Sequence, residues 1–220
     1  MTLDDSEEET KGRSIARHKS KTDAVSAKDH EAPVALVGHK VRVRCVRFSP
    51  TAELLVTSDK TRLCVWKRDV QSTKLVSESA ADAEVNAIDF NETGRYFVLA
   101  CSGGVYFYYL NAGGDAPPTL SGLKGGTVAR FENALFVDIA CGRGRHGAQT
   151  YALTADGQLC CFEQSRLMTK WVGLDSPKGF AIDCDQDRVY AACASGTVRL
   201  LDADTFKYIA TLPKPNAPSD

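Results

Sequence analysis

The chain has 220 residues, of which 43% are hydrophobic and 25% charged, and its formal net charge is −1 at pH 7. This length allows one domain, or two small ones, with a substantial core. The near-neutral charge excludes a general attraction to nucleic acid or to an anionic membrane surface. No apolar run approaches the length of a membrane span and no secretory signal opens the sequence, so we expect no membrane partner.

The eight cysteines include no C-x-x-C pair, and most of them lie within alternating apolar runs. In such runs a thiol behaves as a small hydrophobic group. Disulfides are rare in the reducing compartments of the cell. The pattern therefore predicts reduced, mostly buried thiols and an intracellular, cytoplasmic protein.

Residues 1–31 contain almost no large apolar side chains, and their charges come as an acidic block followed by a basic one. Such a segment cannot bury enough surface to offset the conformational entropy that folding would cost. We therefore expect a disordered tail. Its basic block, between Lys11 and Lys21, is either solvated or a patch for nuclear import or an anionic surface.

Short β-type runs separated by turn residues begin near Pro33, and no segment shows a helical period beyond two turns. Turn signals at intervals of about 8–12 residues indicate an all-β protein. We expect strands at Val43–Phe48, Leu54–Val56, Leu63–Trp66, Val85–Phe90, Tyr96–Ala100, Val105–Tyr109, Phe136–Cys141, Thr150–Leu153, Leu159–Phe162, Phe180–Cys184, Val189–Cys193 and Val198–Leu201.

These strands fall into four repeated units. The units are separated by 42, 54 and 39 residues when they are aligned on the residues that close each third strand, namely Trp66, Tyr108, Phe162 and Leu201. A period of about 40–45 residues with four strands per unit is typical of β-propeller blades. A loop insertion at Ala112–Pro118 explains the long middle interval. We therefore predict four degenerate blades over residues 32–217, with 218–220 as a C-terminal end.

The first and last predicted blades lack a neighbour. Val34–Leu36 is expected to be an outer strand with no blade of its own, and Tyr208–Ala210 to be the outer strand of the last blade. A blade buries its two apolar faces only by stacking against neighbours. Four blades therefore form a partial propeller that self-associates through exposed apolar ends, part of a larger propeller, or an unusually small closed ring.

The first unit resembles a WD repeat. It has a Gly38-His39 turn before the inner strand, Phe48-Ser49-Pro50 after it, and a closing Trp66. The resemblance implies a structural tie in which His39, a Ser or Thr, an Asp and Trp66 are hydrogen-bonded across the blade. Asp59 lies seven residues before Trp66 instead of the usual six, so the pattern predicts an imperfect tie.

Three longer stretches, 122–146, 154–174 and 194–217, resemble the family of large WD-repeat scaffolds that contains mitogen-activated protein kinase-binding protein 1 and its spindle-pole paralogue. The resemblance implies signalling or centrosomal protein partners and a location in the cytoplasm, at the centrosome or spindle pole. It also implies self-association and a long kinase-docking region, which has no counterpart among these residues.

The run Gly142–Gly147 matches G-x-G-x-x-G, but a strand pattern follows it where a dinucleotide site needs a helix. We therefore predict a glycine-rich connection between strands and no nucleotide cofactor. Cys141 and His146 lack a second pair of metal ligands, and Cys160-Cys161 point to opposite faces of a strand. No metal site is expected.

Two groups of basic residues are candidate partner sites. Arg143, Arg145 and His146 lie on the glycine-rich loop, which is either a site for an acidic peptide or phosphate or an exposed solvated loop. Arg42, Arg44 and Arg47 alternate with apolar residues along the first inner strand. They are either a basic rim of the central channel or the polar face of an ordinary strand.

The inventory of catalytic residues is poor. His18 and His30 lie in the tail, His39 belongs to the implied tie, and His146 has no Ser or Cys partner in the sequence pattern. We predict a non-enzymatic, protein-binding scaffold without a cofactor or a small-molecule substrate. The alternative is a propeller that binds nucleic acid or chromatin, which the near-neutral charge disfavours.

Overall fold

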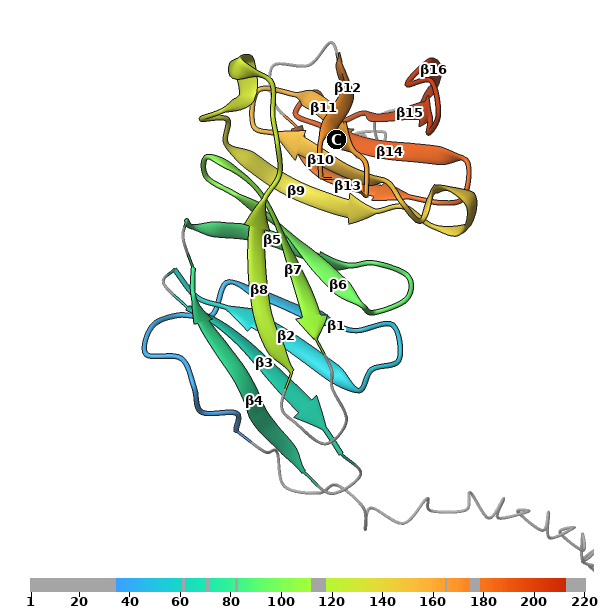
Figure 1. Cartoon of the computed structure of the whole chain (residues 1–220). Coiled ribbons are helices and arrows are strands. Elements are labelled where there is room, and N and C mark those ends of the chain that lie inside the picture. The colour runs from blue at the N-terminus through green and yellow to red at the C-terminus, as the bar shows by residue number, and fades with distance from the viewer. Residues whose placement is uncertain are drawn as a thin grey trace, which may run out of the picture. The chain divides into compact units, whose positions relative to one another are not determined.

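Figure 1 shows the computed structural model, which describes residues 35–60, 62–69, 72–81, 83–111, 118–164, 166–174 and 179–212. The chain divides into two compact units, Met1–Ala35 and Leu36–Asp220, and all described elements belong to the second. The predicted tail at 1–31, most of the predicted loop at 112–118 and the C-terminal end at 218–220 lie outside the described residues.

The described chain forms four antiparallel sheets of four strands each, and strands consecutive in sequence are neighbours in each sheet. We call these sheets blades 1 to 4 in chain order. The prediction of an all-β fold with four propeller blades is confirmed. The strands are β1 (Cys45–Phe48), β2 (Leu54–Ser58), β3 (Arg62–Arg68), β4 (Thr73–Ala80), β5 (Val85–Phe90), β6 (Tyr96–Cys101), β7 (Gly104–Asn111), β8 (Thr119–Lys124), β9 (Phe136–Cys141), β10 (Thr150–Thr154), β11 (Gln158–Phe162), β12 (Met168–Gly173), β13 (Gly179–Cys184), β14 (Arg188–Cys193), β15 (Val198–Asp202) and β16 (Tyr208–Leu212).

Two short 3-10 turns, η1 (Ala129–Phe131) and η2 (Gly144–His146), complete the described elements. No helix within the described ranges is long and apolar enough to span a membrane.

Polar side chains close the turns between strands. In blade 2, the side-chain oxygen of Asn91 accepts the Tyr96 N–H at 3.0 Å, and Gly94 has a φ of +71° that favours glycine. In blade 1, Ser49 Oγ accepts the Leu54 N–H at 3.0 Å. Such side-chain bonds replace backbone pairs that a tight turn leaves open.

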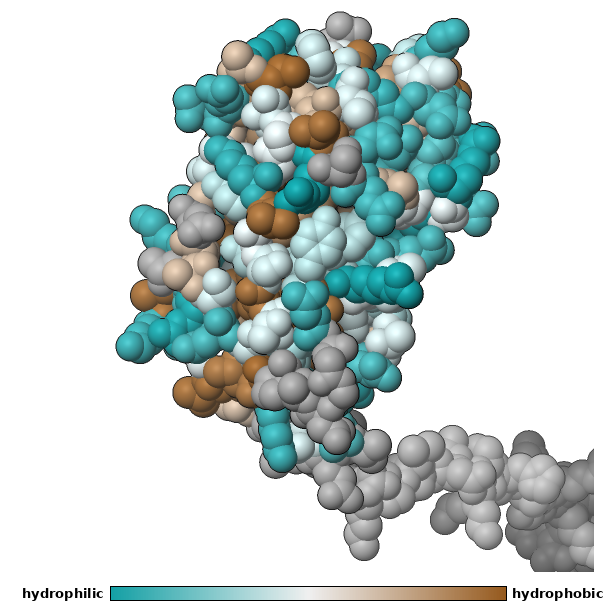
Figure 2. Space-filling model, viewed as in Figure 1, coloured by the Kyte–Doolittle hydropathy of each residue, from teal (hydrophilic) through white to brown (hydrophobic). Residues whose placement is uncertain are grey.

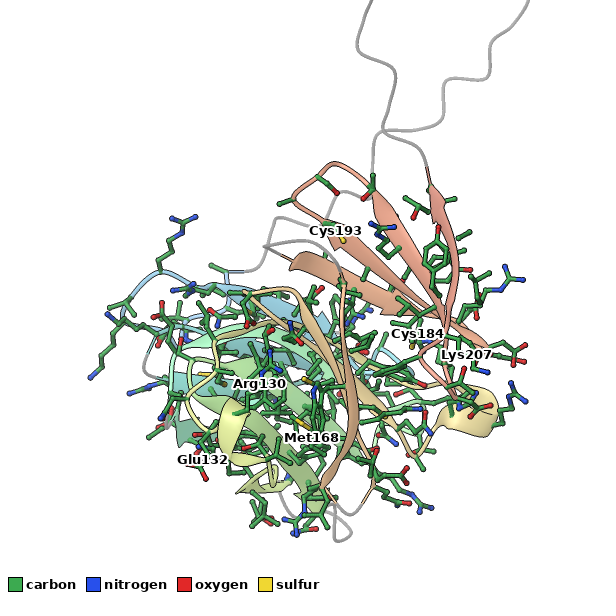
Figure 3. All side chains as sticks on the ribbon, turned by 90° about the horizontal axis from the view of Figure 1, so that it is seen from above. Arg130, Glu132, Met168, Cys184, Cys193 and Lys207 are labelled. Atoms are coloured by element: carbon green, nitrogen blue, oxygen red, sulfur yellow. The ribbon has the colours of Figure 1, made fainter. Side chains whose placement is uncertain are left out.

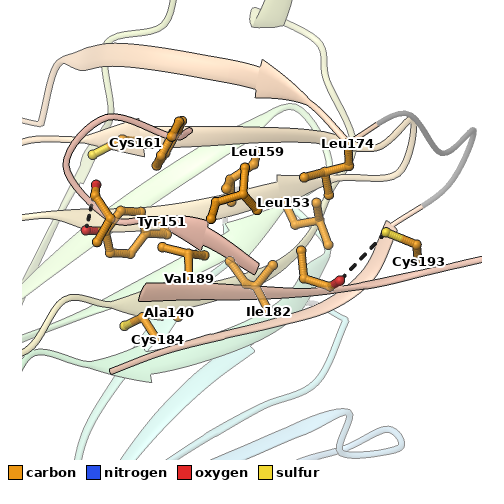
Figure 4. Packing of buried hydrophobic residues seen from close by; sticks show 14 residues of the cluster. Ala140, Tyr151, Leu153, Leu159, Cys161, Leu174, Ile182, Cys184, Val189 and Cys193 are labelled. Carbon is orange, nitrogen blue, oxygen red and sulfur yellow. Dashed lines mark hydrogen bonds between the residues drawn. The ribbon is translucent and has the colours of Figure 1, made fainter. Parts of the chain in front are cut away.

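The hydrophobic cores lie between successive blades. Three separate clusters of buried side chains join blade 1 to blade 2, blade 2 to blade 3, and blade 3 to blade 4. Figure 4 shows the last of these, in which Tyr151 and Leu159 of blade 3 pack against Ile182 and Val189 of blade 4. Each blade is therefore apolar on both faces, as stacking requires.

Two aspartates connect consecutive inner strands. The buried Asp89 of β5 accepts Nε and Nη2 of Arg47 in β1, at 3.0 and 2.7 Å, and the N–H of Cys141 in β9 at 2.8 Å. Asp138 of β9 accepts the N–H of Ile182 in β13 at 2.7 Å. Each inner strand is the edge of its sheet, so part of its backbone has no strand partner. These two carboxylates provide acceptors for backbone N–H groups of the neighbouring inner strands and so connect consecutive blades.

The expected outer strand at Val34–Leu36 is wrong over the described residues 35 and 36, which are not in a strand. Blade 1 already has its four strands, with β4 as the outer one, and these two residues do not join it. The Leu36 side chain instead packs on the outward face of blade 1, against Leu55, Cys64 and Trp66.

The same face remains partly uncovered at β1, where Val46 and Phe48 are 57% and 51% exposed. Among the described residues, blade 4 lies at the far end of the stack from blade 1 (Figure 1). The remaining surface visible in this view is mainly hydrophilic, with small, separate hydrophobic patches (Figure 2).

Candidate functional site

A chain of hydrogen bonds crosses the interior of blade 1. Trp66 Nε1 donates to Thr57 Oγ1 at 2.8 Å, Thr57 Oγ1 lies 2.6 Å from His39 Nε2, and His39 Nδ1 lies 2.8 Å from Asp59 Oδ2. An indole N–H can only donate and a carboxylate can only accept. Thr57 Oγ1 therefore accepts from the Trp66 indole, and the His39 ring connects that hydroxyl to the Asp59 carboxylate, to which Nδ1–H donates. We call these four residues the blade tie.

The tie is complete although its spacing in sequence is unusual. The turn after Asp59 accommodates the extra residue, because its carboxylate also accepts the Arg62 N–H at 2.8 Å. Gly38 is needed beside the tie, since a Cβ there would lie 2.7 Å from the Trp66 ring. The two loops that carry His39 and Asp59 are therefore held together at one end of blade 1.

These two loops form a solvent-open pocket of about 650 Å³, which we call the basic pocket. It is lined by Val41, Arg42, Val43, Arg44 and Lys60. The first four residues follow His39 of the tie, and Lys60 follows Asp59. The hydrogen-bonded tie thus sets the distance between the two walls.

The charges of the basic pocket are only partly neutralised. Arg44 pairs with Glu84 of the segment before β5. No ion pair within the described part of the chain involves Arg42 or Lys60. Sequence reasoning placed Arg42 and Arg44 in the first inner strand, but β1 begins at Cys45, so both precede it. Lys60 was not predicted, because only the folded turn brings it to the other two residues.

Of Arg42, Arg44 and Arg47, the last lies within β1. It lines a second pocket, of about 390 Å³, with Val46, Phe48, Pro50, Asp89, Phe90 and Arg143. Burial opposes the charge of Arg47, but the negative charges of Asp89, Asp183 and Asp138 together outweigh this effect and raise the arginine pKa. Arg47 is therefore bound to blade 2 and is not free to meet a partner.

The glycine-rich loop between β9 and β10 is a single 3-10 turn, not the start of a helix. A Cβ at Gly142 would lie 2.0 Å from the His146 carbonyl oxygen, so the loop folds back too tightly for any other residue. The Gly144 N–H donates to Glu92 of blade 2 at 2.9 Å. The glycines allow the chain to fold back tightly in this loop. The helix that a dinucleotide fingerprint requires does not follow them.

The three loop candidates have different environments. His146 is 3% exposed, and its Nδ1 lies 3.4 Å from Asp204, so this side chain lies inside the protein and does not present its ring to a partner. Arg145 is exposed but pairs with Asp187 at 2.7 Å and lies 3.5 Å from Asp204. These contacts attach the loop to blade 4. Arg143 alone points to a pocket, beside Arg47.

Seven of the eight cysteines are buried, and Cys45 is partly exposed. Burial raises the thiol pKa to about 12 for Cys160, about 11 for Cys161 and about 12 for Cys184. A thiol that resists ionisation is a poor nucleophile and a poor metal ligand. Within the described ranges, no group of three or more His, Cys, Asp or Glu residues could hold a metal ion.

Comparison with known proteins agrees with this geometry. A sequence profile described as "WD domain, G-beta repeat" matches residues 32–67, which contain the whole blade tie. The chain is 34% identical to mitogen-activated protein kinase-binding protein 1 of Mus musculus over 156 residues, and 30% identical to WD repeat-containing protein 62 of Mus musculus over 155 residues. The chain is a WD-repeat protein.

Each of these matches covers 69% of the WD-repeat chain but 10% of the relative, so the chain spans about a tenth of the length of the relatives. The predicted resemblance to this group of WD-repeat proteins is confirmed.

Two solved structures share the fold of this WD-repeat protein. The β-propeller domain of Myceliophteria thermophila Cps50 (Swd1) has a TM-score of 0.66 at 13% identity, and the match covers 80% of this chain and 60% of that one. U3-55K has a TM-score of 0.64 at 14% identity, covering 79% and 53%. At such low identity these matches show the propeller fold alone.

Proposed function

We propose that this WD-repeat protein is a non-enzymatic scaffold and that its basic pocket binds an acidic segment of a partner protein. The observation that carries the proposal is the pairing of Arg42 and Lys60 across an open pocket on two loops held by the blade tie. Because the tie holds the two loops together, binding a carboxylate ligand does not have to bring the two cations together from separate parts of the chain. The relatives named as mitogen-activated protein kinase-binding proteins support a protein as the partner.

The histidines in the described part of the chain support a role without catalysis. Nδ1 and Nε2 of His39 are both engaged in the blade tie. His146 is buried against Asp204, and no nucleophile pairs with it within the described ranges. A general base must reach the substrate's proton, and neither ring is placed to do so.

The test is a quantitative pull-down from dividing cells with the wild-type protein and the double variant Arg42→Glu, Lys60→Glu. A matched control is Arg68→Glu, because Arg68 is exposed at the opposite end of β3 from the Lys60 turn. We expect the double variant to lose a set of partners that the control keeps. Equal partner sets for all three proteins would contradict the proposal.

The same experiment distinguishes protein from nucleic acid. Nuclease treatment of the lysate should leave the captured proteins unchanged if they bind the pocket directly. Loss of capture after nuclease treatment, with a steep fall in binding as salt rises, would indicate phosphate contacts and replace the proposal with nucleic-acid binding.

A further inference from the structure

A second cleft lies at the outer side of the junction between blades 3 and 4. It has a volume of about 420 Å³ and is lined by Val172, Gly173, Leu174, Arg199, Leu201, Phe206 and Tyr208. Figure 3 shows the two sheets side by side, with Met168 of β12 labelled in blade 3 and Lys207, next to β16, in blade 4. We call this the outer cleft. Its walls are aliphatic and aromatic apart from one guanidinium group.

That guanidinium, of Arg199 in β15, is incompletely satisfied. Its Nη1 donates to Thr211 Oγ1 at 2.6 Å, but its buried Nε has no hydrogen-bond partner within the described chain. No carboxylate among the described residues pairs with Arg199. A buried donor without a partner is unfavourable, so its presence beside a cleft indicates that an acceptor would be bound there.

The chain itself shows which acceptor fits this edge of a guanidinium. Arg47 binds the Asp89 carboxylate through Nε and Nη2. In Arg199 the bond to Thr211 uses Nη1, so the Nε–Nη2 edge remains available for a ligand. A carboxylate matches the planar fork of this edge.

A second cation adds to the positive charge of the same junction. Lys170 of β12 lies 4.7 Å above the Phe206 ring, and its ammonium donates to the carbonyl oxygens of Ala203 and Asp204. No carboxylate within the described ranges forms an ion pair with it. Phe206 therefore lies close to both Lys170 and the Arg199 cleft, and the junction favours an anion over a neutral group.

One exposed aromatic side chain lies beside the Arg199 guanidinium group. The Tyr208 ring lies 5.8 Å from the Arg199 guanidinium carbon and is itself 60% exposed. Exposed side chains change rotamer within picoseconds to nanoseconds. The Tyr208 hydroxyl also lies 2.9 Å from Thr211 Oγ1, so a rotation of the ring that exposes the guanidinium edge would break that bond.

We infer that the outer cleft binds a short peptide segment in which an acidic residue is flanked by apolar residues. The carboxylate would pair with Arg199, and the apolar neighbours would contact Val172, Leu174 and Phe206. The inference rests on the proposed function in that its ligand is a protein segment. The outer cleft and the basic pocket share no residues, so an experiment can contradict either binding site without contradicting the other.

The probes are two peptides that differ in one charge, acetyl-Leu-Asp-Leu-amide and acetyl-Leu-Asn-Leu-amide, titrated to millimolar concentration into the isotope-labelled full chain. The Arg199 Nε–H resonance is followed by NMR. We expect a saturating shift with the Asp peptide and binding at least about tenfold weaker with the Asn peptide, since a bond to a charged group contributes about 1.5–3 kcal/mol.

Three variants complete the test. Arg199→Gln should weaken binding of the Asp peptide by about tenfold or more, Arg199→Lys should give an intermediate affinity because it keeps the charge but not the planar fork, and Arg95→Gln, at an exposed site in blade 2, should bind as the wild type does. Dispersed amide spectra confirm that each variant is folded.

Equal binding of the two peptides, no saturation with the Asp peptide, or unchanged binding by Arg199→Gln would each overturn the inference. If Arg199→Gln still captures the partners that depend on Arg42 and Lys60, the proposed function stands whatever the outer cleft does.

Discussion

Cys160 and Cys161 are consecutive in β11, yet they lie in two different hydrophobic cores. Cys160 packs with blade 2 residues, including Val105 and Phe107, and Cys161 packs with blade 4 residues, including Val189 and Phe206. Side chains alternate across a strand, so one blade contributes to the core on each side of it. The folding of each blade is therefore coupled to that of its neighbours.

This burial predicts a strong selectivity in thiol chemistry. A water-soluble thiol reagent should label Cys45 alone at a measurable rate in the native protein, because the other seven thiols are buried, and all eight after unfolding. Mass spectrometry of the labelled peptides checks the result. Rapid native labelling of Cys160 or Cys161 would contradict the description of the cores.

The raised thiol pKa values also fix the sign of a pH effect. Above the ordinary value of 9.0 the unfolded chain releases thiol protons, whereas folded Cys160 keeps its proton until about pH 12. The folded state then binds more protons than the unfolded state, so the free energy of unfolding should fall as pH rises through about 9. Denaturant unfolding at several alkaline pH values measures this fall.

The blade tie should be sensitive to loss of its central hydroxyl. Thr57→Val keeps the shape of the side chain but leaves the Trp66 N–H and His39 Nε2 without their partner. We expect a loss of about 1–3 kcal/mol in the free energy of unfolding. The control Thr119→Val, at an exposed strand end, should change it by less than about 0.5 kcal/mol. Urea unfolding of both variants decides whether the tie stabilises blade 1.

Asp89 and Asp183 are the penultimate residues of β5 and β13, but only Asp89 joins three inner strands. Asp89→Ala leaves the buried Cys141 N–H unpaired, whereas Arg47 is partly exposed and can be hydrated. We therefore expect a loss of about 1–3 kcal/mol. Asp183→Ala should cost less, because Asp183 is exposed and its carboxylate accepts the N–H of the next residue, Cys184. Equal losses would show that the connection between blades contributes little.

The exposed Val46 and Phe48 predict self-association of the purified chain. Apolar groups on an uncovered blade face gain free energy when a second molecule removes them from water. Light scattering should show a mass that rises with concentration, and Phe48→Ser should reduce that rise. A monodisperse, thermally stable monomer at all concentrations would refute this prediction.

Much of the fold could be predicted from sequence because the middle strands are largely apolar, as in Tyr96–Cys101, where every residue is buried, and the inner strands are apolar at most positions. The outer strands β4, β8 and β12 could not be predicted in this way. No residue of these strands is fully buried, as in Thr73–Ala80, so no continuous hydrophobic run marks them. Their positions depend on the neighbouring strand of the same sheet.

The candidate site was only partly predictable for a related reason. Arg42 and Arg44 could be found because they are two residues apart in the sequence, but Lys60 joins them only through the turn at Asp59. The opposite error concerns His146, which looked free in the sequence because Asp204, its partner from blade 4, is 58 residues away. Charge pairs between blades cannot be recognised from the sequence around either residue, because the partner lies far away in the chain.

The most direct measurement of the central claim is a fluorescence anisotropy titration of the full chain with a labelled acidic peptide rich in Asp and Glu. The structure predicts saturable binding that Arg42→Glu, Lys60→Glu weakens about tenfold or more and that Arg68→Glu leaves unchanged. Equal affinity of wild type and the double variant, or tighter binding of a labelled DNA duplex than of the peptide, would contradict the assignment of the basic pocket as a protein-binding site.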